Sequence, residues 1–328
     1  MIFEGFIGQF YWQKYFSALV AERRYAHAYL FSGPRHLGKR TFVKMLSRAM
    51  LCHNFTAKGA CGQCDSCRSW RGDEHPDLLR LKLAADTSSI GVDEVRDFIA
   101  AIQQTPLTAN CRAAVIENLD SMTIEGLNVL LKTLEEPPRT AILFLVTESA
   151  ENLPATVRSR LQHCLFSIVP RRTLIETLTA DGVPRARAFE LAALSHGRPG
   201  LIFYWRSNSV ALKDYQTESR QFLELCGSSL KERFAFTENI FKADDLAPSD
   251  LKRVLSHWRL LLRDLLVLCA NEPGLVSHVF LRPTLDEVAK KHHLQEWSAK
   301  YQSLEWLEWM ISRNANRRLA LNNFLITL

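Results

Sequence analysis

The first half of the chain alternates short apolar runs with amphipathic stretches. Five apolar runs have the length of buried strands, and they occupy residues 29–31, 78–83, 113–116, 142–146 and 164–169. Three intervening stretches repeat their apolar residues at helical spacing, and they occupy residues 42–50, 92–104 and 123–136. Strands that alternate with helices predict a three-layer α/β domain with a parallel five-stranded sheet and a pocket at the carboxyl ends of the strands.

The second half of the chain carries only helical patterning. Residues 171–180 and 184–195 predict two short helices, and Gly197 begins a third segment. From about residue 207 onward the apolar spacing is helical throughout, most clearly over residues 251–268. We therefore expect three domains, which are an α/β domain (1–169), a small helical lid (170–206) and an all-α domain (207–328).

Composition narrows the class of protein. A length of 328 residues suits two or three domains. No apolar run approaches the roughly 18–20 residues of a membrane span, and the N-terminus lacks the features of a signal peptide. The net charge of +6 is compatible with work near nucleic acid, but no five-residue block of Lys and Arg indicates a direct grip on it. A cytosolic protein without a membrane partner is expected.

A glycine loop with a lysine follows the first apolar run. It reads Gly-Pro-Arg-His-Leu-Gly-Lys, and a helical pattern begins directly after it. Strand, loop and helix form the context of a phosphate-binding loop, in which Gly33 and Gly38 let backbone N–H groups converge on an anion and Lys39 adds a positive charge. The next position should carry a hydroxyl for Mg²⁺, but it is Arg40, with Thr41 one place late. The loop therefore has the form of an ATP site without its metal ligand.

The remaining catalytic positions of such a site are altered as well. The third apolar run leads into Glu117-Asn118, where a working ATPase of this class carries Asp-Glu. Glu117 could still bind a metal, but the amide of Asn118 cannot serve as a base. Thr147 ends the fourth run and offers a hydroxyl at the tip of the sheet. We expect a degenerate ATP site, with nucleotide binding possible and hydrolysis absent, made of Gly33, Gly38, Lys39, Thr41, Glu117 and Thr147.

Four of the eight cysteines lie in one short window, with the spacing C-x8-C-x2-C-x2-C. They are Cys52, Cys61, Cys64 and Cys67. Clustered thiols in a reducing compartment indicate a metal rather than disulfides, and four thiolates form the closed tetrahedral shell of structural zinc. An iron–sulfur cluster and a metal-free loop are the alternatives, although the bacterial iron–sulfur run ends in C-x3-C-P and this one does not. We expect a structural Zn²⁺ insert over residues 52–67.

Six motifs together carry a resemblance to one family. They are Gly8-Gln9, residues 27–31, the loop 33–39, the four-cysteine insert, residues 128–138 with the sequence NVLLKTLEEPP, and Ser159-Arg160. They resemble the bacterial clamp-loader AAA+ subunits, which are the delta-prime and gamma/tau subunits of DNA polymerase III. The resemblance is specific over residues 1–200 and only architectural over residues 207–328. It implies an AAA+ domain with a zinc insert, then a helical lid and an all-α collar domain.

The resemblance also implies roles for single residues. A gamma/tau motor would carry Lys-Thr or Lys-Ser in the loop, Asp-Glu after the third strand and an Arg in the lid. The corresponding positions here are Lys39-Arg40, Glu117-Asn118 and Gly200. All three departures point to lost hydrolysis, which the delta-prime type tolerates. Arg160 is retained, and the resemblance implies that it acts as an arginine finger on the ATP of a neighbouring subunit.

The expected function follows from this resemblance. It implies a non-motor, delta-prime-like subunit that has no ATPase activity of its own but belongs to a DNA polymerase holoenzyme. The implied partners are gamma/tau and delta subunits and, through the complex, the sliding clamp and primed DNA. Two alternatives remain open. One is a gamma/tau-like ATPase motor in which Thr41 or a water replaces the missing hydroxyl, and the other is a zinc-containing DNA-binding regulator that uses the α/β domain as a scaffold.

Overall fold

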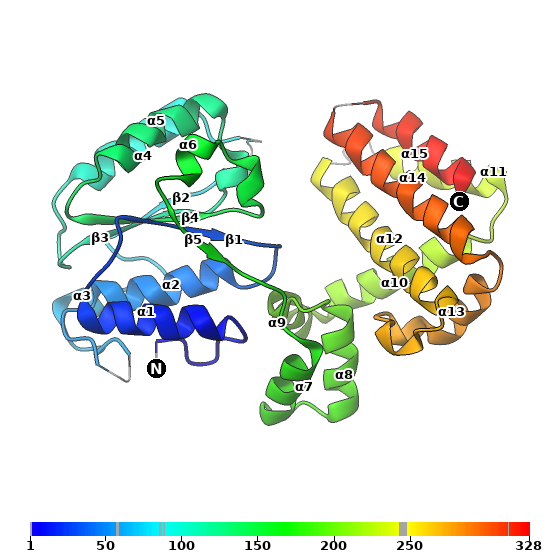
Figure 1. Ribbon diagram of the computed structural model, residues 1–328, viewed down its shortest axis with the longest axis horizontal. Helices are drawn as coiled ribbons and strands as arrows, with labels where there is room; N and C mark the ends of the chain where they lie inside the picture. Colours follow the sequence, from blue (N-terminus) through cyan, green and yellow to red (C-terminus); the bar gives the residue numbers. More distant parts are fainter. Residues whose placement is uncertain (1, 57–58, 85–86, 88, 243–247, 314) are drawn as a thin grey trace. The chain divides into compact units, whose positions relative to one another are not determined.

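A computed structural model describes residues 2–56, 59–84, 87, 89–242, 248–313 and 315–328 (Figure 1). The chain divides into two compact units. The sheet unit comprises Met1–Thr177 and Gly197–Gly200, and the helical unit comprises Leu178–His196 and Leu201–Leu328. The three-domain division at residues 169 and 206 stays a prediction.

A five-stranded parallel sheet in the order β2-β3-β4-β1-β5 organises the sheet unit. The strands are β1 (Ala28–Ser32), β2 (Leu78–Leu81), β3 (Arg112–Ile116), β4 (Ala141–Val146) and β5 (Gln162–Leu165). Every residue of β1, β3 and β4 is buried, as the continuous apolar runs of a parallel sheet require. The predicted parallel α/β sheet is confirmed.

Helices cover both faces of this sheet and complete the three layers (Figure 1). The helices of the sheet unit are α1 (Phe10–Glu22), α2 (Lys39–Leu51), α3 (Asp65–Arg68), α4 (Val92–Gln103), α5 (Ile124–Glu135) and α6 (Ala155–Arg158). Tyr29 and Phe31 of β1 pack in one core cluster with residues of α1 and α2, whereas Leu30 packs in the other with residues of α4 and α5. Alternate side chains of the strand therefore fill opposite cores.

The last strand of the sheet differs from its predicted range. The pattern predicts a strand over residues 164–169, but β5 begins at Gln162 and ends at Leu165. Beyond this end, the N–H of Ser167 donates to the Gln9 side chain (3.2 Å), and the N–H of Val169 donates to the carbonyl of Gly197 (2.8 Å). Phe166 and Val169 remain buried, but the backbone N–H groups of Ser167 and Val169 bond to segments outside the sheet.

The helical unit is built from helices that pack around one apolar core. The helices that follow the sheet are α7 (Arg171–Ala180), α8 (Arg185–Leu194), α9 (Pro199–Ser207), α10 (Ser209–Leu225), α11 (Leu230–Lys242), α12 (Pro248–Cys269), α13 (Arg282–Ala289), α14 (Leu294–Ser312) and α15 (Arg317–Thr327), with α7 and α9 contributing residues to both units. Phe222, Trp258 and Phe324 stack in the core of this unit. Among the described residues, no helix is long and apolar enough to cross a membrane.

Candidate nucleotide and metal sites

The glycine loop joins β1 to α2, as the strand–loop–helix pattern predicts. Gly33 (φ 133°) and Gly38 (φ 85°) both adopt the left-handed backbone conformation that favours glycine. A Cβ on Gly33 would collide with the carbonyl oxygen of Phe166, and one on Gly38 would lie 2.9 Å from the ring of Phe6. Packing against backbone therefore requires glycine at position 33, and the positive φ favours glycine at position 38, whether or not a ligand is bound.

The lysine of the loop is engaged by the loop itself. Lys39 is buried, and its ammonium donates to the carbonyl oxygens of Gly33 and of Pro34, the latter at 2.8 Å. Burial lowers the pKa of Lys39 to about 8, against the opposing effect of the Glu148 and Asp120 carboxylates. The charge that should meet a phosphate is thus already paired with backbone oxygens.

The position that should supply a Mg²⁺ hydroxyl, Arg40, forms an ion pair with Glu117, the acidic residue after the third strand. Arg40 Nε lies 3.6 Å from Glu117 Oε2, and its Nη2 donates to the Glu117 carbonyl at 3.2 Å. Arg80 Nε (3.6 Å) and Lys82 Nζ (4.0 Å) approach the other carboxylate oxygen of Glu117. Three cations therefore surround this one carboxylate, and Thr41 lies exposed on α2.

Thr147 belongs to a second polar cluster beside the loop. Its hydroxyl donates to Asp120 Oδ1 (2.5 Å), and Asp120 Oδ2 accepts the N–H of Glu148 (2.8 Å). Glu148 in turn forms an ion pair with Arg35 of the loop. Sequence reasoning missed Asp120, although its place three residues after Glu117 is a signal that could have drawn attention to it.

The position aligned with the lid arginine of a motor lies directly against the loop. The N–H of Gly200 donates to the carbonyl of His36 (2.8 Å). A Cβ on Gly200 would stand 2.7 Å from that same oxygen, so this contact leaves no room for a side chain. His27 precedes β1 whereas the loop follows it, which places this histidine at the opposite edge of the sheet from the phosphate loop.

The four cysteines of the insert converge on one point. The sulfur atoms of Cys52, Cys61, Cys64 and Cys67 all lie within 4.8 Å of one another, and those of Cys61 and Cys67 are 3.9 Å apart. A tetrahedral shell with metal–sulfur bonds of about 2.3 Å needs sulfurs roughly 3.8 Å apart, so the cluster fits such an ion.

Backbone N–H groups favour the thiolate form of Cys61, whereas burial raises the pKa of the Cys52 and Cys67 thiols. The N–H groups of Gln63 (3.5 Å) and Cys64 (3.4 Å) point at Cys61 Sγ and lower the pKa of its thiol to about 6. The N–H of Cys61 points at Cys52 Sγ (3.3 Å), and that of Cys67 at Cys64 Sγ (3.4 Å). Four sulfur ligands with such donors can hold a metal ion but leave no open position for catalysis.

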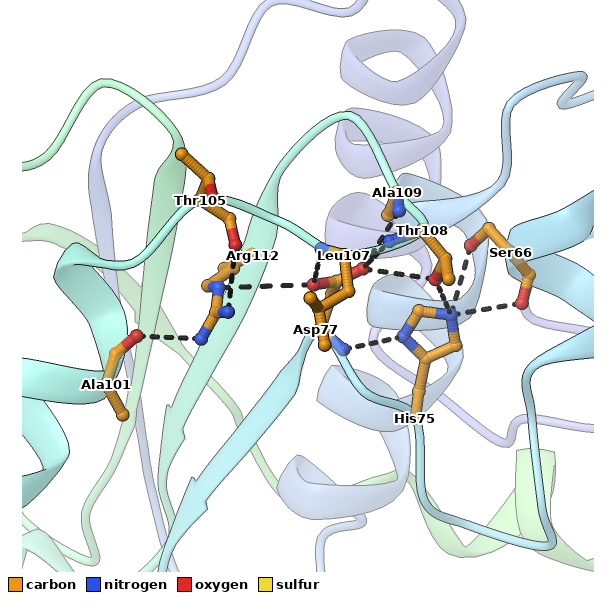
Figure 2. A network of polar contacts seen from close by, with 9 residues as sticks. All are labelled: Ser66, His75, Asp77, Ala101, Thr105, Leu107, Thr108, Ala109 and Arg112. Carbon is orange, nitrogen blue, oxygen red and sulfur yellow. Dashed lines mark hydrogen bonds and ion pairs between the residues drawn. The ribbon is translucent and has the colours of Figure 1, made fainter.

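A buried polar network joins this insert to the sheet (Figure 2). The carboxylate of Asp77 accepts the N–H groups of Leu107 (2.7 Å), Thr108 (2.8 Å) and Ala109 (2.9 Å). Burial alone would raise the pKa of Asp77, but these donors lower it below its usual value. Arg112 Nε lies 3.9 Å from Asp77 Oδ1, and the rest of its guanidinium donates to the carbonyls of Ala101 in α4 and of Thr105 just after it.

His75 extends the network to the cysteine insert. Its Nδ1 accepts the N–H of Asp77 (3.0 Å), so its Nε2 carries the proton and donates to the carbonyl of Ser66 (3.0 Å). Ser66 lies between two of the cysteines, and its hydroxyl donates to the Leu51 carbonyl (2.6 Å). Ser66, His75 and Asp77 are thus a structural link and not a nucleophilic triad, because the serine proton points away from the histidine. No sequence spacing announced this link.

Arg160, the proposed finger, follows α6 at the surface. Its side chain is 35% exposed and pairs with Glu135 Oε1 at 2.6 Å. Its Nη1 also donates to the Thr156 carbonyl (2.8 Å). Arg160 is separate from the phosphate-loop contacts described above.

Comparison with known proteins relates the sheet unit to one family. Residues 9–169 match the family described as DNA polymerase III, delta subunit. The chain is 32% identical over 191 residues to DNA polymerase III subunit delta′ of Pseudomonas aeruginosa, which covers 57% of this chain and 58% of that protein. It is 30% identical over 173 residues to subunit tau of Bacillus subtilis, which covers 53% of this chain and 30% of that protein.

A solved structure adds a distant likeness in shape. A gamma-subunit-related protein of Thermotoga maritima aligns with 95% of this chain and 97% of its own, at a TM-score of 0.47 and 17% identity. The two sequence relatives are both longer than the aligned region, since the chain spans 58% and 30% of their lengths. Through its sheet unit, this chain belongs to the clamp-loader subunit family of DNA polymerase III, which includes delta-prime and tau/gamma.

Proposed function

We propose that this chain is a non-motor, delta-prime-like subunit of the DNA polymerase III clamp loader. The observation that carries the proposal is the ion pair between Arg40 and Glu117. In a phosphate-loop ATPase the residue after the lysine gives Mg²⁺ a hydroxyl, and an acidic residue after the third strand completes the metal shell. Here these two positions neutralise each other, so the site has little electrostatic need for a divalent cation.

The neighbouring contacts support the same conclusion. Lys39 donates to loop carbonyls, and Thr147 donates to Asp120. A nucleotide would have to break these contacts before it could make its own. Asn118 offers no base to activate water. We therefore expect weak nucleotide binding or none, and no hydrolysis by this chain.

Arg160 is proposed to act on the ATP of an adjacent subunit. Its ion pair with Glu135 is partly exposed, and such pairs contribute only about 0–1 kcal/mol, so releasing the guanidinium costs little. An arginine finger supplied in trans is typically worth roughly 10³–10⁵ in rate. The chain would then contribute to catalysis in the complex without turning over nucleotide itself.

We assign Zn²⁺ to the four cysteines, in a structural role. The ion would order the insert between α2 and β2, and it would take no part in a reaction because all four of its positions are filled. The three-domain division, with a lid over residues 170–206 and a collar over residues 207–328, belongs to this proposal. The partners would be gamma/tau and delta subunits, with the sliding clamp and primed DNA reached through the complex.

The first experiment is ATP binding and turnover by the isolated chain, with and without Mg²⁺. No turnover with weak or no binding is the expected result. Steady Mg²⁺-dependent hydrolysis that Lys39→Ala abolishes would identify a motor subunit instead. Salt-sensitive DNA binding by the lone chain, lost when the cysteine insert is disrupted, would favour a DNA-binding regulator.

The second experiment tests Arg160 in a reconstituted clamp loader. Arg160→Ala should leave assembly intact, measured by gel filtration, and reduce DNA-stimulated ATP turnover and clamp loading by about tenfold or more. Arg158→Ala, two residues away and also exposed, is the matched control. Unchanged turnover in the Arg160→Ala complex would remove this residue from the mechanism.

A further inference from the structure

A cavity of about 450 Å³ lies at the amino-terminal edge of the sheet, opposite the phosphate loop. Its lining comes from the ends of α1 and α2 and from the segments that lead into β1, β3 and β4. The floor is apolar, and it includes Val20, Ala49, Met50 and Ile142. Its volume falls in the range of pockets that bind ligands, roughly 300–1,000 Å³.

The rim of this cavity is cationic. Its polar side chains are those of Arg23, Tyr25, His27, Asn110 and Arg139, and no Asp or Glu occurs among the described residues that line it. The guanidinium of Arg23 donates to the carbonyl of His53, which holds it beside the cysteine insert. Arg139 is exposed and makes no hydrogen bond or ion pair within the part of the chain that the structure describes. The rim therefore offers N–H donors and positive charge to an incoming anionic group.

The walls are held in place by the cysteine insert and by the network of Figure 2. Cys52 and Phe55 line one side, and Cys111, next to Asn110, lines another. Asp77 fixes the backbone just before Asn110 by accepting three successive N–H groups. His75 ties this arrangement to Ser66 of the insert. A site with preformed walls loses less freedom when it binds, which favours affinity.

We propose that this cavity docks an acidic peptide segment of a partner protein, with one large apolar side chain of the peptide on the floor and its carboxylates against Arg23 and Arg139. Charge complementarity selects an acidic partner, because the described lining residues include two arginines and no carboxylate. The volume accommodates one or two large side chains. Two arginines above an apolar floor would neutralise few phosphates, so nucleic acid fits this site poorly. The site adds a partner surface to the proposed function and does not depend on the state of the phosphate loop.

The test is a selection of random twelve-residue peptides, displayed on phage, against the full chain purified with Zn²⁺. We expect enrichment of acidic peptides that contain Phe, Trp, Leu or Ile. A synthetic, fluorescein-labelled copy of the strongest peptide then gives Kd values by fluorescence polarisation. Exchange of its apolar residue for Ala, or of its acids for Gln, should weaken binding by about tenfold each, which corresponds to roughly 1.4 kcal/mol.

Two variants place the peptide in the cavity. Arg139→Glu reverses a charge on the exposed rim and should weaken binding at least about tenfold, whereas Arg24→Glu, exposed and outside the lining, should not. Ile142→Trp fills the floor and should abolish binding; if it does not fold, Arg139→Glu still decides. Enrichment of basic peptides, no enrichment, or equal binding by the Arg139→Glu chain would overturn the proposal. Displacement of the labelled peptide by single-stranded DNA would also overturn it and assign the site to nucleic acid.

Discussion

The phosphate loop and the cysteine insert both carry a ligand-binding motif, yet their polar groups are arranged in opposite ways. At the loop, Arg40 meets Glu117 and Lys39 meets backbone carbonyls, so unlike charges and dipoles satisfy one another. At the insert, four sulfurs of the same kind face a common centre, and backbone N–H groups favour the charged form of Cys61. Like groups that converge need a ligand of opposite charge, whereas paired groups do not. The cysteine insert therefore has the arrangement of a ligand site, whereas the polar groups of the phosphate loop are already paired with one another.

Loss of the metal should have the largest effect in this comparison. Cys64→Ser removes one of four ligands and should abolish stable Zn²⁺ retention, because structural zinc contributes on the order of 10 kcal/mol to the segment it orders. The metal content after dialysis against a chelator measures retention, and protease sensitivity of residues 52–67 reports order. Cys269→Ser, in the helical unit, is the control. If the insert stays protease-resistant without metal, then the cysteine insert, like the phosphate loop, does not need its ligand to be ordered.

Disruption of the Asp77 network, which links the insert to the sheet, should have the second-largest effect. Asp77→Asn replaces one acceptor oxygen with an NH₂ group, so the part-buried N–H groups of Leu107, Thr108 and Ala109 lose part of their acceptor. The free energy of unfolding should fall by about 3 kcal/mol, since each buried donor without a partner costs roughly 1–3 kcal/mol. Urea denaturation measures it, with exposed Asp93→Asn as the control. A change below about 0.5 kcal/mol, the usual size for a surface substitution, would mean that the network carries little stability.

The same substitution has a defined pH dependence. The folded state lowers the pKa of Asp77, so its contribution to stability is present above the ordinary Asp pKa of about 4 and is lost as the pH falls through the lower folded value. The unfolding free energies of wild type and Asp77→Asn should therefore differ at pH 7 and converge in strong acid. A constant difference down to the lowest pH at which the chain folds would contradict this assignment.

The smallest expected effect is a gain at the phosphate loop. Arg40→Thr supplies the missing hydroxyl and frees Glu117 from one cation. ATP binding to this variant should become at least about tenfold tighter in Mg²⁺ than in EDTA, a difference of roughly 1.4 kcal/mol, while wild type should show no such preference. Lys44→Thr removes a cation from the next turn of α2, where it pairs with Asp73 and not with Glu117, and is the control. Metal-independent binding by Arg40→Thr would show that Arg40 is not what excludes Mg²⁺.

Periodicity and local motifs predicted most of the helices and strands of the sheet unit. They did not predict hydrogen bonds and ion pairs between residues far apart in the sequence. Buried strands and amphipathic helices leave a local signature, so β1, β3, β4 and α5 fall within about two residues of their predicted ranges. The end of β5 differs from its predicted position, because the backbone N–H groups beyond it bond to Gln9 and Gly197, which are distant in the sequence. The cysteine spacing was local and predicted a cluster that the structure brings together.

The partners within the phosphate-loop site show why the rest was missed. The sequence indicated that Arg40 replaces a hydroxyl, but Glu117, which it pairs with, lies 77 residues away. His75 and Asp77 have no motif spacing, and their role depends on a loop some thirty residues downstream, which only the β2–β3 pairing brings near. A polar network around a single acid or histidine can therefore be predicted only once the topology of the fold is known.

The two loop glycines have a consequence for how genomes are surveyed. Both positions have positive φ, and a Cβ on Gly33 would collide with the Phe166 carbonyl, so folding penalises larger residues here whether or not the chain turns over nucleotide. The glycine pattern of an ATPase can therefore persist because the fold requires it. Counts of ATPases that rest on this pattern alone would therefore include any chain that has lost turnover, and the residue after the lysine, Arg40 here, is a second position to inspect.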